Sequence, residues 1–250
     1  MNTIVVIPAR MASSRFPGKP LKKILGRSMI EHVWRRACLC SRVNRVVIAT
    51  CDQLILDECK RIGAQGIMTS DKHSSCVDRV AEAAQKISAD VIINLQGDIP
   101  LVHPQCLEEL IKPFKDKEVL FTDMMGPIHN CAEENNLNVV KVVVDKKSNA
   151  LYYSREPLPS GRKISTEVVV TRYKQFGINA YRQDSLKLFT SLAPTPLEKI
   201  ESVDMLRLLE NRYVVRMVNF DYPSVGVDTD EDLQHAEKLM QVDQFYKTYA

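Results

Sequence analysis

Short apolar runs recur along the first hundred residues of the chain. The clearest are Thr3–Pro8, Val43–Thr50 and Asp90–Leu95, all rich in valine and isoleucine. Continuous apolar runs of this length are typical of strands that are covered on both faces of a parallel sheet. The pattern therefore predicts three buried strands.

Amphipathic segments separate these runs, with apolar residues at the spacing of one helix face. They cover Met29–Cys40, Gln53–Ile62 and Val80–Ile87. Alternating strands and helices predict an α/β fold with a doubly wound, mostly parallel sheet. Ligands bind such sheets beyond the carboxyl ends of the strands. The loops that follow the three strands are therefore expected to converge on one crevice.

The second half of the chain has a different pattern. Its predicted strands are Val139–Val144, Val168–Thr171, Phe176–Tyr181 and Tyr213–Phe220. Its predicted helices are Thr195–Asn211 and Thr229–Met240, the second with Asp228 or Thr229 as N-cap. The sequence shows no internal repeat and no clear linker. We expect residues 1–250 to form a single domain with a smaller subdomain inserted at about 125–215.

Composition narrows the possible classes of function. The net charge is +3 and the basic residues are scattered, which argues against a nucleic-acid binder. No apolar run approaches the roughly 18 residues that span a bilayer, and the first residues do not resemble a signal peptide. The seven cysteines include no C-x-x-C pair, so neither a disulfide framework nor a zinc site is expected. These features predict a cytoplasmic protein with no nucleic-acid or membrane partner.

A cation-rich loop follows the first predicted strand. The segment PARMASSRFPGKPL, residues 8–21, carries Arg10, Arg15 and Lys19 together with Gly18. Cations neutralise phosphate charge, and glycine lets backbone N–H groups approach a phosphate closely. The segment matches neither GxxxxGK[ST] nor GxGxxG. A solvated basic loop is the alternative, but the position after a strand favours phosphate binding.

Two segments with a glycine shortly before an aspartate offer carboxylates for a metal. Asp98 follows the third predicted strand in NLQGDIP, and Asp228 follows a short apolar stretch in SVGVDT. A carboxylate at the carboxyl end of a strand is well placed to hold Mg²⁺ on a nucleotide phosphate. The alternatives are a turn-forming aspartate at residue 98 and a helix N-cap at residue 228.

The segment HSSCVDR, residues 73–79, is a weaker signal. It places a histidine and hydroxyls before a predicted helix, whose N-terminus can face a nucleotide. Asp78 and Arg79 are equally compatible with a charged pair on the surface. His73 is equally compatible with a capping or surface role.

Taken in order, PARMASSRFPGKPL, INLQGDIPL and GVDTDEDL resemble the CMP-Kdo synthetases (3-deoxy-manno-octulosonate cytidylyltransferases). The resemblance runs from about Ile4 to Met240. It implies a Rossmann-like domain with a smaller part for acceptor binding and dimer contacts, and hence a homodimer. It also implies transfer of CMP from CTP to a Kdo-like sugar acid, with Mg²⁺ as cofactor, in lipopolysaccharide biosynthesis.

The resemblance also implies roles for individual residues. The implied metal ligands are Asp98 and Asp228, which together with Arg10 and Lys19 form the implied catalytic set. The implied nucleotide-binding residues are Ala9, Arg10, Arg15, Lys19, Ser74, Arg79, Gln96 and Gly97. The implied acceptor-binding residues are Arg155, Gln175, Tyr181, Glu201 and Met205.

The sequence departs from the family pattern at three places. Cys76 and Val77 replace a Gly-Thr pair near the nucleotide, Gln175 replaces a histidine, and Met205 replaces a glutamine. Losing a hydrogen-bonding group from a buried polar site costs about 1–3 kcal/mol. We therefore expect the reaction type to be retained, with either Kdo or a related acid as acceptor. The alternative acceptors are 8-amino-Kdo, a sialic-acid-like sugar or a phosphonate, and a non-catalytic nucleotide-binding regulator is a further alternative.

Overall fold

The computed structural model describes residues 1–12, 16–73, 75–160, 171–223 and 225–250. The chain forms two compact units, residues 1–108 with 223–250 (unit 1) and residues 109–222 (unit 2). The expected single domain with a subdomain at about 125–215 stays a prediction. No helix in the described part of the chain is long and apolar enough to cross a membrane.

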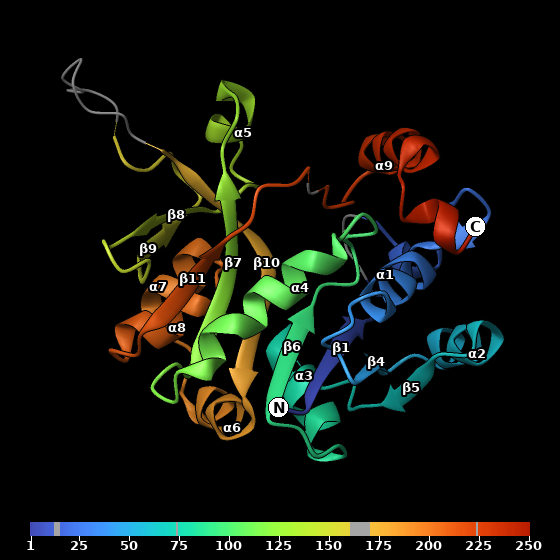
Figure 1. Cartoon of the computed structure of the whole chain (residues 1–250), viewed down its shortest axis with the longest axis horizontal. Coiled ribbons are helices and arrows are strands. Elements are labelled where there is room, and N and C mark those ends of the chain that lie inside the picture. The colour runs from blue at the N-terminus through green and yellow to red at the C-terminus, as the bar shows by residue number, and fades with distance from the viewer. Residues whose placement is uncertain (13–15, 74, 161–170, 224) are drawn as a thin grey trace. The chain divides into compact units, whose positions relative to one another are not determined.

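Unit 1 contains four parallel strands in the order β6-β1-β4-β5 (Figure 1). They are β1 (Thr3–Ala9), β4 (Arg45–Thr50), β5 (Gln65–Met68) and β6 (Val91–Leu95). Every residue of β1 and β6 is buried. The three predicted strands are confirmed, whereas β5 was missed because its short sequence QGIM has no continuous apolar run.

Three helices connect these strands, namely α1 (Met29–Cys38), α2 (Gln53–Ile62) and α3 (Cys76–Gln85). All three were predicted. Helix α3 begins four residues earlier than its apolar pattern indicated, because the hydroxyl of Ser75 caps it by accepting a hydrogen bond from the Asp78 N–H.

The strand order creates a switch point between β1 and β6. The chain runs from β1 to β4 to β5 and then returns to pair β6 on the other side of β1. Because such crossovers are right-handed, the return places α3 on the opposite face of the sheet from α1 and α2. The loops after β1 and β6 diverge there and open the crevice in which α/β sheets bind ligands.

Further elements lie wholly or partly in unit 1. They are η1 (Lys19–Leu21), β2 (Lys23–Ile24), β3 (Arg27–Ser28), α4 (Pro104–Ile111, which ends in unit 2), α9 (Asp230–Val242) and η3 (Tyr246–Thr248). Met240 and Ala236 of α9 pack against Phe16, Ile24 and Met29. Helix α9 thereby fixes the segment that precedes it, which carries Asp228.

The described part of unit 2 contains five strands in the order β11-β7-β10-β8-β9, with β10 in the middle. Strand β7 (Phe121–Pro127) pairs parallel with β11 (Val215–Asn219) and antiparallel with β10 (Tyr173–Arg182). Strand β8 (Lys141–Val144) pairs antiparallel with β10 and with β9 (Ala150–Ser154). Strand β7 was missed because its sequence FTDMMGP contains a charge and no valine or isoleucine.

Helices of unit 2 include η2 (Lys112–Lys115), α5 (Cys131–Asn135) and α6 (Gln183–Ser191). The predicted helix Thr195–Asn211 is wrong, since α7 (Pro196–Glu201) and α8 (Met205–Glu210) replace it. Ser202 ends α7 with a positive φ of 53°, which no continuous α-helix contains. Apart from Thr171, the predicted strand Val168–Thr171 lies outside the described residues.

Candidate active site in unit 1

Two carboxylates from distant parts of the sequence meet at one ammonium group. Lys19 Nζ lies 2.7 Å from Asp98 Oδ2 and 2.8 Å from Asp228 Oδ1. The Lys19 side chain is 13% exposed, and the two carboxylates are about one-third exposed. The structure therefore brings together three of the four residues that were predicted to be catalytic.

Asp98 is positioned by the loop that follows β6. A Cβ atom on Gly97 would lie 3.1 Å from the Pro8 carbonyl oxygen and 3.2 Å from Ile30 Cδ1. Glycine thus lets this loop lie directly against the end of β1. The Val227 N–H donates to the Asp98 carbonyl at 2.9 Å, which joins the segments that carry Asp98 and Asp228 through their backbones.

Asp228 is not the N-cap of the last helix. Thr229 takes that role, since its hydroxyl accepts from the Asp232 N–H and the Asp232 carboxylate accepts from the Thr229 N–H. Because the capping box uses Thr229 and Asp232, the Asp228 carboxylate contacts Lys19 instead.

The cation-rich loop is folded back on itself after β1. Gly18 has a φ of 70° and donates its N–H to the Met11 carbonyl at 3.2 Å. The Met11 N–H in turn donates to Asp52 Oδ2 at 2.8 Å, just after β4. The loops after β1, β4 and β6 converge as predicted, and Lys19 begins the 3₁₀ turn that follows Gly18.

A hollow of about 290 Å³ opens at this point. It is lined by most of the residues predicted for nucleotide and metal binding, namely Ala9, Arg10, Lys19, Gln96, Gly97, Asp98 and Asp228. A second hollow shares Ala9, Arg10 and Cys76 with the first and is bordered by Arg79. Arg15 and Ser74, also predicted to bind the nucleotide, lie outside the described residues.

Arg79 is buried rather than a surface partner of Asp78. The residue is only 3% exposed. Its Nη1 donates to Thr69 Oγ1 at 2.6 Å and to the Ser70 carbonyl at 3.2 Å. These contacts fix the guanidinium between β5 and α3 at the edge of the second hollow. His73 also lines the second hollow, and its Nε2 lies 2.6 Å from Glu82 Oε2 of α3.

Electrostatics favour a cation between the two carboxylates. Burial lowers the pKa of Lys19, but Asp98 and Asp228 more than offset this effect and hold the pKa above its ordinary value. No group of three or more histidine, cysteine or acidic side chains forms a metal cage in the described part of the chain. Mg²⁺ needs no such cage, because it is commonly held by one or two carboxylates together with substrate phosphates. Asp98 and Asp228 fit that requirement.

Two of the predicted acceptor residues are joined in unit 2. The Arg155 N–H donates to Glu201 Oε2 at 2.8 Å, and Arg155 Nε donates to the Glu201 carbonyl at 2.6 Å. Ser154 Oγ also donates to Glu201 at 3.1 Å. Lys141 Nζ donates to the Arg155 carbonyl at 2.7 Å. The end of β9 and the end of α7 are therefore held together by charge-assisted hydrogen bonds.

Tyr181 and Met205 lie in the core of unit 2. Both residues are 0% exposed. The Tyr181 ring stacks on Phe189 with ring centroids 5.9 Å apart, and its hydroxyl donates to Asn179 Oδ1 at 2.7 Å. Neither side chain offers a surface to an acceptor in this structure, and their predicted role is not supported by their position.

Gln175 contacts a buried acid, Asp123, that no sequence motif indicated. Its Nε2 donates to Asp123 Oδ2 at 2.7 Å, and Tyr153 donates its hydroxyl to the same oxygen at 2.9 Å. Burial raises the pKa of Asp123 to about 8, although both hydrogen bonds favour its ionised form. The only available signal was an aspartate within the mostly apolar segment LFTDMM.

Known cytidylyltransferases match nearly the whole chain. A family model described as cytidylyltransferase matches residues 4–218. A 3-deoxy-manno-octulosonate cytidylyltransferase of Geobacter metallireducens is 41% identical, over 96% of this chain and 98% of that protein. One from Thermodesulfovibrio yellowstonii is 40% identical over the same shares of both chains.

Solved structures also match nearly the whole chain. The structure of CMP:2-keto-3-deoxy-manno-octonic acid synthetase complexed with CTP superposes with a TM-score of 0.90 at 36% identity, covering 96% of this chain and 99% of that one. A cytidylyltransferase from Leptospira borgpetersenii superposes with a TM-score of 0.65 at 16% identity, covering 98% and 90%. The second similarity concerns the fold alone.

Proposed function

The chain belongs to the cytidylyltransferase family, and from this premise we propose that it transfers CMP from CTP to the hydroxyl of a 3-deoxy-manno-octulosonate-like sugar acid. The observation that carries the proposal is the Lys19 ammonium held by Asp98 and Asp228 in a hollow at the switch point of the sheet. The arrangement puts a cation and two carboxylates at the edge of the sheet where α/β proteins bind nucleotides.

The reaction is an in-line displacement at the α-phosphorus of CTP. A bond forms between the acceptor hydroxyl oxygen and the α-phosphorus while the hydroxyl proton passes to water. The bond to the bridging oxygen breaks, and pyrophosphate leaves with that oxygen. The protein contributes position and charge rather than a covalent step. Arg10 and Lys19 line the same hollow and would neutralise the negative charge that builds up on the departing pyrophosphate.

Asp98 and Asp228 would hold Mg²⁺ beside the phosphates. When bound there, the ion supplies positive charge to the α-phosphate and lowers the pKa of the attacking hydroxyl. Lys19 now contacts both carboxylates. Its long side chain can turn toward the triphosphate when the carboxylates acquire another cation.

Pyrophosphate release tests this function directly. Each of the four nucleoside triphosphates is combined with Kdo and Mg²⁺, and the expected result is release with CTP far above the other three. A protein that binds CTP in calorimetry but releases no pyrophosphate with any sugar acid would be the non-catalytic regulator considered above. Equal activity with ATP and CTP would also contradict the proposal.

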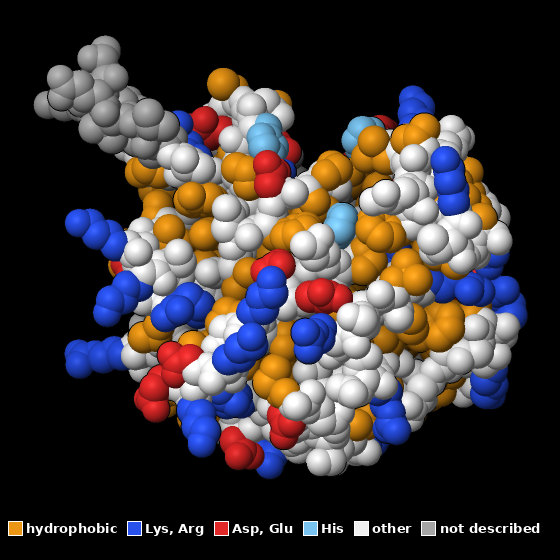
Figure 2. All heavy atoms as spheres, in the orientation of Figure 1, with side chains coloured by type: hydrophobic (Ala, Val, Ile, Leu, Met, Phe, Trp, Pro, Cys, Tyr) orange, Lys and Arg blue, Asp and Glu red, His pale blue; other side chains and the backbone are white. Residues whose placement is uncertain are grey.

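A cytoplasmic location and a homodimer belong to the same proposal. No disulfide links the seven cysteines, all of which lie in the described part of the chain, and this supports a reducing compartment. On the face in view, lysines and arginines are spread out among acidic side chains and form no basic stripe (Figure 2), which supports small-molecule rather than nucleic-acid partners. Light scattering on the purified protein measures the oligomeric state.

A further inference from the structure

The aspartate at the start of helix α2 does not cap that helix. Asp52 occupies the N-cap position with an extended backbone, and an aspartate there usually accepts a hydrogen bond from an N–H group of the first helical turn. Its carboxylate accepts from none of the N–H groups of α2, all of which belong to described residues. Ser28 and Ser75, by contrast, cap α1 and α3 with their hydroxyls. The Asp52 carboxylate is therefore used elsewhere.

Its partner is the loop that follows β1. The ladder between β1 and β4 ends at the Ala9–Thr50 pair, and Met11 and Asp52 each lie just beyond that pair. Asp52 Oδ2 accepts from the Met11 N–H at 2.8 Å. The Asp52 N–H donates to Thr50 Oγ1 at 3.1 Å, which holds the acid at the end of β4. The Asp52 side chain thus gives the Met11 N–H a partner where the ladder no longer provides one.

Met11 is next to both cations that line the first hollow, Arg10 and Lys19. Arg10 directly precedes Met11 in the chain. The Met11 carbonyl accepts from the Gly18 N–H at 3.2 Å, and Lys19 follows Gly18 as the first residue of η1. Because Met11 is bonded at its N–H and at its carbonyl, the backbone beside each cation is held in place.

We propose that Asp52 is a positioning residue for the triphosphate of CTP, acting through the backbone of Met11 on Arg10 and Lys19. The inference rests on the proposed function, in which these two cations meet the departing pyrophosphate. A hydrogen bond from a backbone N–H to a carboxylate is stronger than one to a neutral acceptor. A loop that is held before the nucleotide arrives loses little conformational entropy on binding, whereas a loose loop loses more. The contact should therefore favour CTP over CMP, which lacks the β- and γ-phosphates.

The test compares the binding of CTP with that of CMP. Calorimetric titration in the presence of Mg²⁺ gives the Kd of each nucleotide. Asp52→Ser keeps a favoured N-cap residue at the start of α2, but its side chain is too short to reach Met11. We expect this variant to raise the Kd for CTP about 10-fold and the Kd for CMP less than about twofold. Asp52→Asn keeps an oxygen acceptor of the same reach and should bind CTP within about threefold of the wild type.

A matched control removes a cap that has no part in the loop. Ser28→Ala deletes the hydroxyl that caps α1 and should lower Tm while leaving both Kd values unchanged. Wild-type affinity for CTP in Asp52→Ser would overturn the inference. Equal losses for CTP and CMP would also overturn it, because a purely structural role affects both nucleotides, and so would an Asp52→Asn variant as weak as Asp52→Ser.

The experiment also separates this inference from the proposed function. The Asp52 comparison is made on binding, whereas the proposed function requires turnover. A wild-type protein that binds CTP but releases no pyrophosphate would contradict the proposed transfer, and the comparison of CTP with CMP would still decide the role of Asp52.

Discussion

At the scale of single residues, the decisive contacts are those of Lys19. Its ammonium group touches one carboxylate from the loop after β6 and another from the segment before α9. Each carboxylate alone is compatible with a turn or a cap. Their common contact is what makes the pair a candidate metal site, since two carboxylates and a substrate triphosphate satisfy Mg²⁺.

Replacing Asp98 with asparagine removes one of these charges at constant shape. We expect kcat/KM for pyrophosphate release to fall by at least about 100-fold, because charge stabilisation at the α-phosphate depends on the metal. Circular dichroism and thermal melting should match the wild type, as the side chain is about one-third exposed. Turnover near the wild-type level would show that Asp98 is not a metal ligand.

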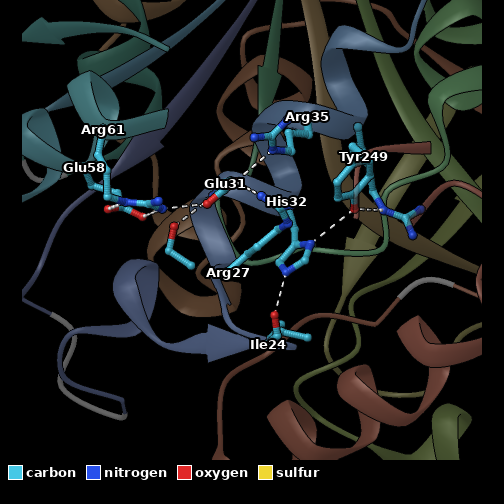
Figure 3. Close-up of polar contacts among 10 residues, drawn as sticks. Ile24, Arg27, Glu31, His32, Arg35, Glu58, Arg61 and Tyr249 are labelled. Atoms are coloured by element: carbon cyan, nitrogen blue, oxygen red, sulfur yellow. Dashed lines mark hydrogen bonds and ion pairs between the residues drawn. The ribbon is translucent and has the colours of Figure 1, made fainter. Parts of the chain in front are cut away.

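At the scale of elements, a buried carboxylate anchors helix α1 to its neighbours. The Glu31 side chain is 1% exposed and contacts Arg27 at 2.7 Å, Arg35 at 2.9 Å and Arg61 at 2.6 Å (Figure 3). Burial alone would raise the pKa of Glu31, but these three arginines lower it to about 2. One carboxylate thus links α1 to α2 and to strand β3.

Removing that charge should destabilise the protein. We expect Glu31→Gln to lower the free energy of unfolding by about 3 kcal/mol, because it leaves three guanidinium groups around an uncharged amide. Urea denaturation measures the change. Asp57→Asn, which changes an exposed acid on α2 that pairs with Lys60, is the matched control and should leave stability nearly unchanged. Equal effects of the two changes would mean that the Glu31 contacts contribute little.

The same helix carries a neutral histidine. His32 Nε2 lies 2.8 Å from the Ile24 carbonyl and Nδ1 lies 3.2 Å from the Tyr249 hydroxyl (Figure 3). Since a carbonyl can only accept, Nε2 carries the hydrogen and Nδ1 accepts from Tyr249. Burial lowers the pKa of His32 to about 4. The described contacts therefore join α1 to the hairpin β2–β3 and to the C-terminal turn.

This histidine makes stability depend on pH. Its pKa is about 6.5 when unfolded and about 4 when folded, so the unfolded chain binds more protons between these values. Stability from this residue is fully present above about pH 6.5 and is lost as the pH falls toward 4. Between pH 7 and 5 we expect a loss of at most about 2 kcal/mol in urea denaturation. The His32→Gln variant should show a shallower loss, and an identical slope would contradict the assignment.

At the scale of the whole molecule, nucleotide binding should be visible as stabilisation. Saturating CTP with Mg²⁺ at about 100 times the dissociation constant would add about 2.7 kcal/mol, which corresponds to a rise of several degrees in Tm. The rise should shrink when EDTA replaces Mg²⁺ and in the Asp98→Asn variant. A Tm shift that is the same with and without Mg²⁺ would show that the nucleotide binds without the proposed ion.

The sequence by itself determined the local elements and the candidate loop. Strands β1, β4 and β6 and helices α1 and α2 were predicted from apolar periodicity, because burial on one or both faces leaves that pattern in the residues themselves. Strand β7 broke the pattern with Asp123, and Ser202 divided a helix whose apolar spacing looked continuous. Both residues contact distant side chains: Asp123 accepts from Tyr153 and Gln175, and the Ser202 carbonyl accepts from Arg155. Such contacts leave no periodic pattern in the local sequence.

Only the tertiary structure decided which side chains meet. Asp98, Asp228 and Lys19 come from three separate segments, and no local pattern records that they share one contact. The same holds for Asp123, Tyr153 and Gln175, which lie on three different strands of unit 2. Tyr181 occupies the core, although the family pattern suggested an acceptor contact. The periodicity of apolar residues indicates which side chains are buried. Hydrogen bonds and ion pairs between distant residues instead depend on how the strands pair.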